Sequence, residues 1–202
     1  MNKNVSKKII RLGILGSTRG TNMLAITAAI KKKQLAATIE IVISNKRDAI
    51  ILERAATQQL PQQFVDATGL TREQYDHKVS TLLREAHVDL IVLIGYMRIL
   101  SADFVRDWEN KIINVHPSLL PDFAGMMDLH VHRAAIAAGV KESGCTVHYV
   151  TAEVDAGPIV LQKKCPVFAD DTPERLKERV QQLEGAALVE AIGVMGSELL
   201  VD

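Results

Sequence analysis

The chain has 202 residues, 48% of them hydrophobic, and its 24 basic side chains balance 24 acidic ones. This length predicts a single domain over residues 1–202, with enough apolar side chains for a sizeable core. A net charge of zero gives no bulk attraction to nucleic acid or to a membrane surface, and no stretch approaches the roughly 20 apolar residues of a membrane helix. We therefore expect neither a nucleic-acid partner nor a membrane partner.

The cysteines and the N-terminus both indicate a cytoplasmic protein. Cys145 and Cys165 are the only cysteines, lie in strand-like runs and lack C-x-x-C spacing, which predicts buried free thiols in a reducing compartment. The N-terminal basic residues precede a short apolar run that Arg11 interrupts and that ends in a Gly/Ser/Thr loop. This pattern is typical of a first strand and not of a signal peptide.

Strand and helix patterns alternate along the chain. Apolar residues at Ile39, Ile41 and Ile43 have the period of a strand, and Thr71 followed by Gln74 is a capping box that begins a helix. Strands are predicted over residues 9–16, 37–44, 62–65, 89–95, 111–115, 145–151 and 157–168, with a possible closing strand over 198–201. Helices are predicted over residues 21–33, 48–59, 71–86, 101–109, 128–138 and from Thr172-Pro173 onward.

The alternation predicts an α/β fold, a single doubly wound, Rossmann-like domain whose mostly parallel sheet becomes mixed in its C-terminal part. Ligands of such folds bind at the carboxyl ends of the strands. We therefore expect the functional residues in the loops that follow the strands.

The first such loop is "GSTRGTN", residues 16–22, between a strand and a helix. Its backbone N–H groups can bind an anion, but its spacing is neither G-x-G-x-x-G nor that of a P-loop, and no acidic residue ends the second strand. This leaves two alternatives, a site for one small phosphate or an ordinary tight turn.

The stretch "NVHPSLLP", residues 114–121, places two polar side chains at the end of a buried strand. Asn114 and His116 are two positions apart, so they share a face and lie about 6–7 Å apart along the strand. A carboxamide and an imidazole so placed can stabilise a developing oxyanion. The alternative is a pair of core residues whose hydrogen bonds are satisfied by neighbours.

Two further stretches contain candidate residues, and a group of histidines requires a separate judgement. Asp155, in the "TAEVDAGP" stretch, is either a turn residue or a partner that approaches His116, orients it and favours its protonated form. Arg98 follows the most apolar strand, and its apolar neighbours in "GYMRIL" are suited to a flat ring. A metal site built from His116, His130 and His132 is disfavoured, and His148 is expected to be packed or at a pocket edge.

Taken in order, "GYMRIL", "NVHPSLLP" and "VDAGPIVLQ" resemble the folate-dependent formyltransferases, most closely the phosphoribosylglycinamide formyltransferase family of purine synthesis. The resemblance includes "SNKRDAIILERA" and "VQQLE" and extends from the first strand to about Glu184. Methionyl-tRNA formyltransferases have a second domain and formyltetrahydrofolate hydrolases an extra N-terminal domain, and neither is expected here.

The resemblance implies a reaction. The formyl group of 10-formyltetrahydrofolate, a co-substrate, passes to the amine of glycinamide ribonucleotide by direct attack, and no metal is required. The partners are then small molecules, and the chain is a monomer or a homodimer. Two other hypotheses are a formyltransferase for another sugar-linked amine and a non-catalytic phosphate-binding α/β module.

The resemblance also implies roles for individual residues. The catalytic residues are Asn114, His116 and Asp155. Phosphoribosylglycinamide is bound by Gly20, Thr21, Asn22, Gln181 and Glu184. The folate is bound by Arg72, Met97, Arg98, Ile99, Leu100, Asn114, Thr151, Ala152, Glu153, Val154 and Asp155.

Three positions depart from the pattern that the resemblance implies. Arg19 stands where many relatives have a small polar residue, and its charge is suited to a phosphate. Met126 and Met127 stand where smaller residues are expected. Gly185 replaces a usual histidine and weakens its helix by roughly 1 kcal/mol relative to alanine.

Overall fold

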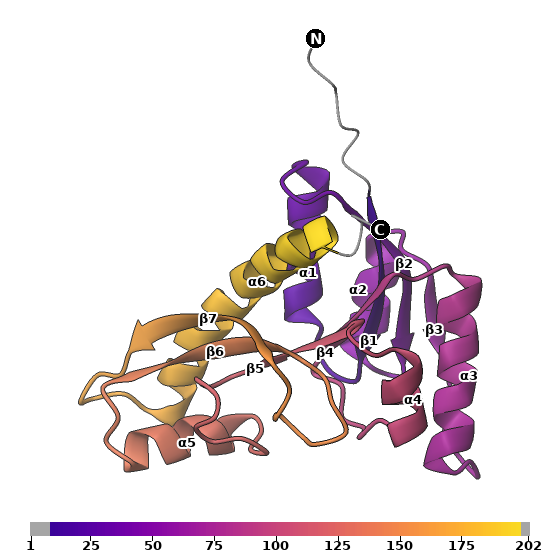
Figure 1. Ribbon diagram of the computed structural model, residues 1–202. Coiled ribbons are helices and arrows are strands. Elements are labelled where there is room, and N and C mark those ends of the chain that lie inside the picture. The colour runs from indigo at the N-terminus through magenta and orange to yellow at the C-terminus, as the bar shows by residue number, and fades with distance from the viewer. Residues whose placement is uncertain (1–8, 199–202) are drawn as a thin grey trace.

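The computed structural model describes residues 9–198 as one seven-stranded sheet with helices on both faces (Figure 1). The strands are β1 Ile10–Gly16, β2 Ala37–Ser44, β3 Gln62–Phe64, β4 Leu90–Ile94, β5 Ile112–His116, β6 Glu142–Tyr149 and β7 Ile159–Pro166. The helices are α1 Thr21–Lys31, α2 Ile50–Thr57, α3 Arg72–Glu85, α4 Ala102–Asp107, α5 Leu129–Ala137 and α6 Pro173–Glu198.

The strand order is β3-β2-β1-β4-β5-β6-β7. Strands β1 to β5 pair in parallel, whereas β6 is antiparallel to both β5 and β7. This confirms the predicted mostly parallel sheet that becomes mixed toward its C-terminal part. The chain order reverses between β1 and β4, which is where ligands of such sheets bind.

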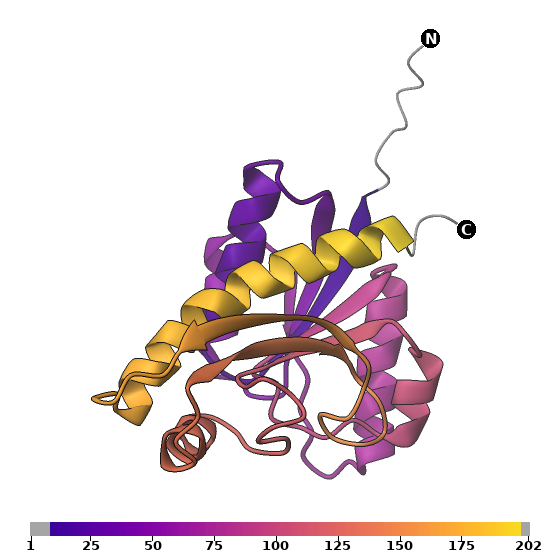
Figure 2. The same ribbon diagram turned by 60° about the vertical axis from the view of Figure 1, so that its left-hand side comes forward.

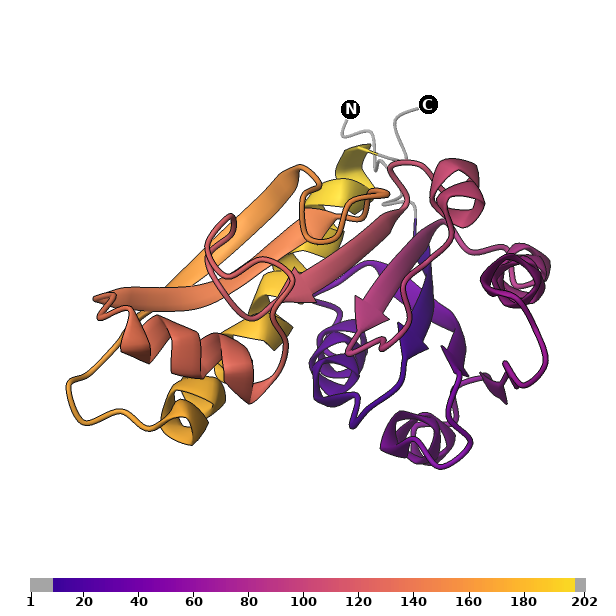
Figure 3. The same cartoon turned by 90° about the horizontal axis from the view of Figure 1, so that it is seen from below.

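The sheet divides the hydrophobic core into two layers, and helices cover each of them. Met23 of α1, Ile51 of α2 and Leu188 of α6 pack on one face of the sheet, whereas Tyr75 of α3 and Phe104 of α4 pack on the other. The long helix α6 runs across its face beside α1 (Figure 2), and the view from below separates α3 and α4 from α1 and α2 (Figure 3). Because both faces are covered, the central strand β4 is buried along its whole length.

The predicted capping box at the start of α3 is confirmed. The Thr71 hydroxyl accepts a hydrogen bond from the Gln74 N–H at 3.2 Å, and Gln74 Oε1 accepts one from the Thr71 N–H at 3.0 Å. The two N–H groups are thus satisfied locally, which is why this boundary is readable from the sequence.

Strand β6 begins at Glu142, three residues before the predicted start at Cys145. The three additional residues, Glu142, Ser143 and Gly144, pair with β7. A Cβ at Gly144 would lie 1.9 Å from the Lys163 carbonyl oxygen, so the close approach of the two strands requires a glycine there.

Other expectations concern the cysteines, the C-terminus and the membrane. Cys145 and Cys165 are buried and free, as predicted. The possible closing strand lies outside the described residues, except for Glu198, which ends α6. Within residues 9–198, no helix combines the length and apolarity needed to cross a membrane.

Candidate active site

Strand pairing brings the polar residues of β5 next to those of β6. In the antiparallel register Asn114 lies opposite His148, and His116 lies opposite Thr146. Asn114 Nδ2 lies 3.3 Å from His148 Nε2. The structure therefore gives Asn114 a neighbour that the sequence analysis did not assign to the site.

Asp155 connects the two histidines. It lies in the loop between β6 and β7 with a positive φ of 55°. Its Oδ2 lies 3.2 Å from His116 Nδ1, and its Oδ1 lies 3.5 Å from His148 Nε2. The predicted approach of Asp155 to His116 is present, and we call Asn114, His116, His148 and Asp155 the polar cluster.

His116 faces an acceptor with each ring nitrogen. Its Nε2 lies 3.2 Å from the Phe123 carbonyl oxygen and its Nδ1 faces Asp155, so only the imidazolium can donate at both positions. Nevertheless burial lowers the pKa of His116, and the opposing charge of Asp155 does not fully offset it. Asp155 thus favours the protonated form of His116, as its charge should, but burial outweighs the carboxylate, so the pKa is lowered overall.

Asp155 keeps its charge in this setting. Burial by itself raises the pKa of its carboxyl, but hydrogen bonds with His148 and with the Gly125 N–H, together with the charge of His116, lower that pKa overall. The Gly125 N–H donates to Asp155 Oδ2 at 2.9 Å. One carboxylate thus contacts both histidines and the loop that follows β5.

His148 was expected to be packed or at a pocket edge, and it is buried inside the cluster. Its Nδ1 lies 2.9 Å from the Tyr149 carbonyl oxygen, so Nδ1 carries a hydrogen. Its Nε2 lies 3.3 Å from Asn114 Nδ2 and 3.5 Å from Asp155 Oδ1, which leaves the second amide hydrogen of Asn114 for another acceptor. Only the β5–β6 register could have identified this residue, and no local pattern encodes that register.

The loop after β1 joins the loop after β4. The Met97 N–H donates to Ser17 Oγ at 2.9 Å, and Ser17 Oγ donates to Asn45 Oδ1 at 2.5 Å. Gly20, with a left-handed φ of 66°, precedes α1 and gives it no side-chain cap. Arg54 Nη1 lies 3.3 Å from Thr21 Oγ1, so a cation stands beside the first turn of α1.

The proposed phosphoribosyl residues of α1 and α6 also meet. Asn22 Nδ2 donates to Glu184 Oε2 at 2.8 Å. Burial raises the pKa of the Glu184 carboxyl, and the hydrogen bond from Asn22 opposes that effect. Gln181 lies one turn before Glu184 and is half-buried. Residues 162 positions apart in sequence are therefore in direct contact.

The proposed folate residues differ in exposure. Met97, Ile99 and Val154 are exposed, as are Arg72 and residues 151–153. Leu100, in contrast, is buried in the core beside α4.

The side chain of Arg98 packs on an aromatic ring. Its guanidinium lies over the Tyr75 ring at 4.1 Å, and its Nε has no hydrogen-bond partner among the described residues. The side chain is therefore oriented by Tyr75 and keeps hydrogen-bonding capacity.

Polar interactions on both sides connect the loop that contains Met126 and Met127 to other parts of the structure. Both methionines are exposed, Gly125 is bonded to Asp155, and Asp128 forms an ion pair with Lys177 of α6. The two methionines, which stand where smaller residues are expected, therefore place apolar side chains on the surface of a loop that is hydrogen-bonded to the polar cluster.

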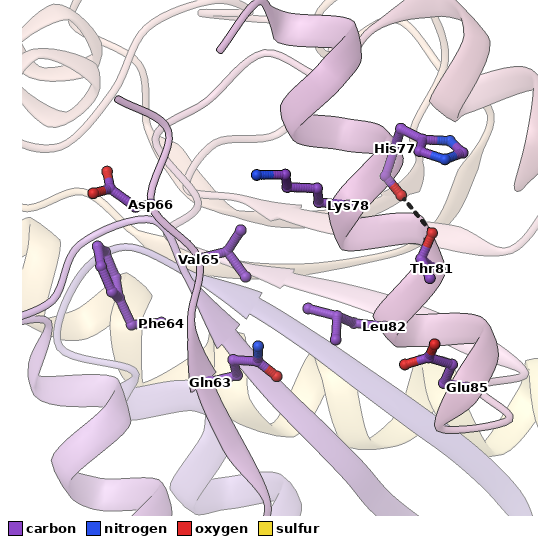
Figure 4. Close-up of a pocket in the computed structure, with 9 residues that line it drawn as sticks. All are labelled: Gln63, Phe64, Val65, Asp66, His77, Lys78, Thr81, Leu82 and Glu85. Carbon is purple, nitrogen blue, oxygen red and sulfur yellow. Dashed lines mark hydrogen bonds between the residues drawn. The ribbon is translucent and has the colours of Figure 1, made fainter. Parts of the chain in front are cut away.

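A separate hollow lies between β3 and α3 (Figure 4). Its wall includes Gln63, Val65 and Asp66 on one side and Lys78 and Leu82 on the other, and it contains no residue of the polar cluster. Among residues 9–198, no group of three or more His, Cys, Asp or Glu side chains is arranged to hold a metal ion.

A doubly wound sheet with an amide, two imidazoles and a carboxylate gathered where β5 ends defines an α/β enzyme suited to proton transfer and oxyanion stabilisation. Residues 10–192 match the sequence profile described as "Formyl transferase". The chain belongs to this family.

Known proteins of the family are similar over most of the chain. The trifunctional purine biosynthetic protein adenosine-3 of Gallus gallus is 41% identical over 93% of this chain, which spans only 18% of that relative. The phosphoribosylglycinamide formyltransferase of Escherichia coli K12 is 41% identical over 86% of this chain and 81% of its own length. The crystal structure of glycinamide ribonucleotide transformylase 1 from Symbiobacterium toebii superposes with a TM-score of 0.89, at 39% identity over 94% of this chain and 89% of that one.

Proposed function

We propose that this chain transfers the formyl group of 10-formyltetrahydrofolate to the amine of glycinamide ribonucleotide. The observation that carries the proposal is the contact of His116 and His148 with one carboxylate, beside Asn114, at the end of β5. The names of the similar proteins, phosphoribosylglycinamide formyltransferase and glycinamide ribonucleotide transformylase, support the choice of acceptor.

In the proposed reaction the substrate amine attacks the formyl carbon, and the carbonyl oxygen becomes an oxyanion. Asn114 donates its second amide hydrogen to that oxygen, since its first faces His148 Nε2. The new bond joins the acceptor nitrogen to the formyl carbon. The bond between that carbon and the folate nitrogen breaks, and tetrahydrofolate leaves.

The attacking amine must lose one proton, and the leaving folate nitrogen must gain one. His116 is suited to both steps. Its lowered pKa keeps the ring neutral and able to accept a proton at neutral pH, and it makes the resulting imidazolium a stronger acid. Asp155, 3.2 Å from Nδ1, stabilises the transient positive charge.

The two substrates are proposed to lie side by side. Thr21, Asn22 and Glu184 would bind the phosphoribosyl part of the acceptor, with Gly20 and Gln181. The exposed residues after β4 and β6, with Arg72, would bind the folate. The hydrogen bond between Met97 and Ser17 supports this proposal, because it connects the loops of the two half-sites.

The test is an assay of folate absorbance and product mass with three acceptors: glycinamide ribonucleotide, glycinamide without the ribose phosphate, and methionyl-tRNA. We expect efficient transfer to glycinamide ribonucleotide alone. Release of formate at the same rate without any acceptor would indicate a hydrolase, and transfer to methionyl-tRNA would indicate a different transferase.

The same assay tests the catalytic residues. His116→Ala and Asn114→Ala should each lower kcat on the order of 10²-fold or more, far more than either change weakens the binding of a substrate. His77→Ala, which changes an exposed histidine of α3, is the matched control and should leave kcat unchanged. Near-normal turnover in the first two variants would refute the oxyanion assignment.

A further inference from the structure

Helix α6 lies against α1 at a glycine. Gly185 is buried, and a Cβ at this position would lie 2.7 Å from the Cβ of Ala25 in α1. Carbon atoms in contact are normally about 3.5–4.0 Å apart, so any larger residue must move the two helices apart by roughly 1 Å. In Figures 1 and 2, α6 crosses α1 at an angle, and the two helices are in contact.

The other glycines of α6 have more space. A Cβ at Gly193 would meet its nearest atom, Leu35 Cδ1, at 3.9 Å, and one at Gly196 would meet Ile10 Cγ2 at 3.6 Å. Both distances are ordinary van der Waals contacts. Gly185 is therefore the glycine of α6 whose missing side chain determines the distance to a neighbouring helix.

The close contact coincides with a polar contact between the same helices. Glu184 immediately precedes Gly185, and Asn22 lies one turn before Ala25. Asn22 Nδ2 donates to Glu184 Oε2 at 2.8 Å, and Asn22 Oδ1 lies 4.0 Å from the position of a Cβ on Gly185. A shift of about 1 Å at Gly185 is enough to break a hydrogen bond of this length.

From this geometry we propose that Gly185 is a positioning residue for the acceptor site. Its lack of a side chain lets α6 approach α1, and this approach holds the Glu184 carboxylate against Asn22 at the N-terminal turn of α1. A ribose phosphate ester is the chemistry that fits the pair. The phosphate binds backbone N–H groups at the start of α1, and the ribose hydroxyls donate to Glu184. The inference rests on the proposed function.

The test compares alanine substitutions at two glycines of one helix. Gly185→Ala should raise KM for glycinamide ribonucleotide roughly tenfold or more, with kcat and the Kd of the folate within about twofold of wild type. Gly193→Ala adds the same methyl group to the same helix, and it should leave KM within about twofold. An unchanged KM in Gly185→Ala, or an equal rise in Gly193→Ala, would overturn the proposal.

Rescue separates spacing from general damage. The double variant Ala25→Gly/Gly185→Ala moves the methyl group from α1 to α6, and it should restore KM to within about threefold of wild type. Failure of this rescue in a folded protein counts against the spacing argument. If Gly185→Ala does not fold, Ala25→Val increases the bulk at the same contact from the other helix and should raise KM in the same way.

A binding measurement separates this inference from the proposed function. Ribose 5-phosphate titrated by calorimetry reports the acceptor half-site without any catalysis. If the wild-type protein binds ribose 5-phosphate and Gly185→Ala weakens that binding, the inference stands even where no formyl transfer to glycinamide ribonucleotide is detected. If the transfer occurs but Gly185→Ala changes neither KM nor this binding, the inference is wrong while the proposed function stands.

Discussion

Asp155 has an unusual set of contacts for a residue in a turn. Its backbone has a positive φ of 55°, and its carboxylate contacts two imidazoles and one backbone N–H. Positive φ is uncommon outside glycine and is better tolerated by Asp and Asn. The strained backbone directs the carboxylate inward to His116 and His148, where its charge acts on both rings.

The charge of Asp155 determines the pH at which His116 titrates. Burial lowers the pKa of His116 and Asp155 raises it, so Asp155→Asn should lower that pKa further. We expect kcat to fall at least about tenfold and the acid limb of kcat/KM to move to lower pH. The pH profile of kcat/KM measures this shift.

The matched control for this prediction is Asp170→Asn, which neutralises an exposed aspartate paired with Arg175. Its pH profile should coincide with that of the wild type. A profile that also stays unchanged in Asp155→Asn would mean that Asp155 has only the structural role of a turn residue.

At the scale of elements, α5 contains a buried histidine. His132 is 2% exposed, and its Nδ1 has no hydrogen-bond partner among the described residues. Burial lowers the pKa of His132 to about 4, the charge of Lys177 acts in the same direction, and Asp128 opposes them. The burial of α5 therefore favours the neutral form of the His132 ring.

This packing predicts a loss of stability in acid. The unfolded chain binds a proton at His132 near pH 6.5 and the folded chain only near pH 4, so the free energy of unfolding falls as the pH drops between these values. One such proton contributes at most about 1.4 kcal/mol per pH unit. His132 makes its full contribution to the free energy of unfolding above about pH 6.5, and this contribution is lost below about pH 4. The lowered pKa of His116 acts with the same sign.

Chemical denaturation at several pH values between about 4.5 and about 7.5 measures this dependence of the unfolding free energy on pH. His132→Gln should reduce the pH dependence of the unfolding free energy, whereas His77→Gln, on the exposed surface of α3, should not. An identical pH dependence in His132→Gln and in the wild type would exclude His132 as a source of acid sensitivity.

At the scale of the whole molecule, the fold places two loops on one edge of the sheet. Strands β1 and β4 are neighbours and parallel, so the loops that follow them leave the same edge. The first loop leads to α1 on one face, and the second leads to α4 on the other. This divergence is the arrangement at which open α/β sheets bind their ligands.

Two substitutions should therefore have opposite effects. Asn22→Ala should raise KM for glycinamide ribonucleotide and leave the folate affinity nearly intact, because it removes the partner of Glu184. Ile99→Trp should weaken folate binding alone, because it enlarges an exposed side chain in the loop after β4. Calorimetric titration of each variant with each ligand measures the pattern.

Val194→Trp enlarges an exposed aliphatic residue near the end of α6 and serves as the control, with both affinities expected unchanged. If Asn22→Ala and Ile99→Trp weaken the same ligand, or if neither weakens any, the assignment of the two half-sites is wrong even where the activity is present.

The sequence by itself was sufficient for the features that depend on short spacing. Strand and helix alternation led to the doubly wound sheet, and the spacing of Thr71 and Gln74 led to the start of α3. The two-residue spacing of Asn114 and His116 put both side chains on one face of a strand. These features are encoded within a few residues, because backbone geometry repeats over that distance.

Other features were decided only by the tertiary structure. His148 joins Asn114 through the β5–β6 register, and Gly185 meets Ala25 through the packing of α6 on α1. The direction of the His116 pKa shift depends on how deeply the ring is buried, which its neighbours in sequence do not determine. Register, helix packing and burial all arise from contacts between distant segments, so they form only when the sheet and its two helical layers come together.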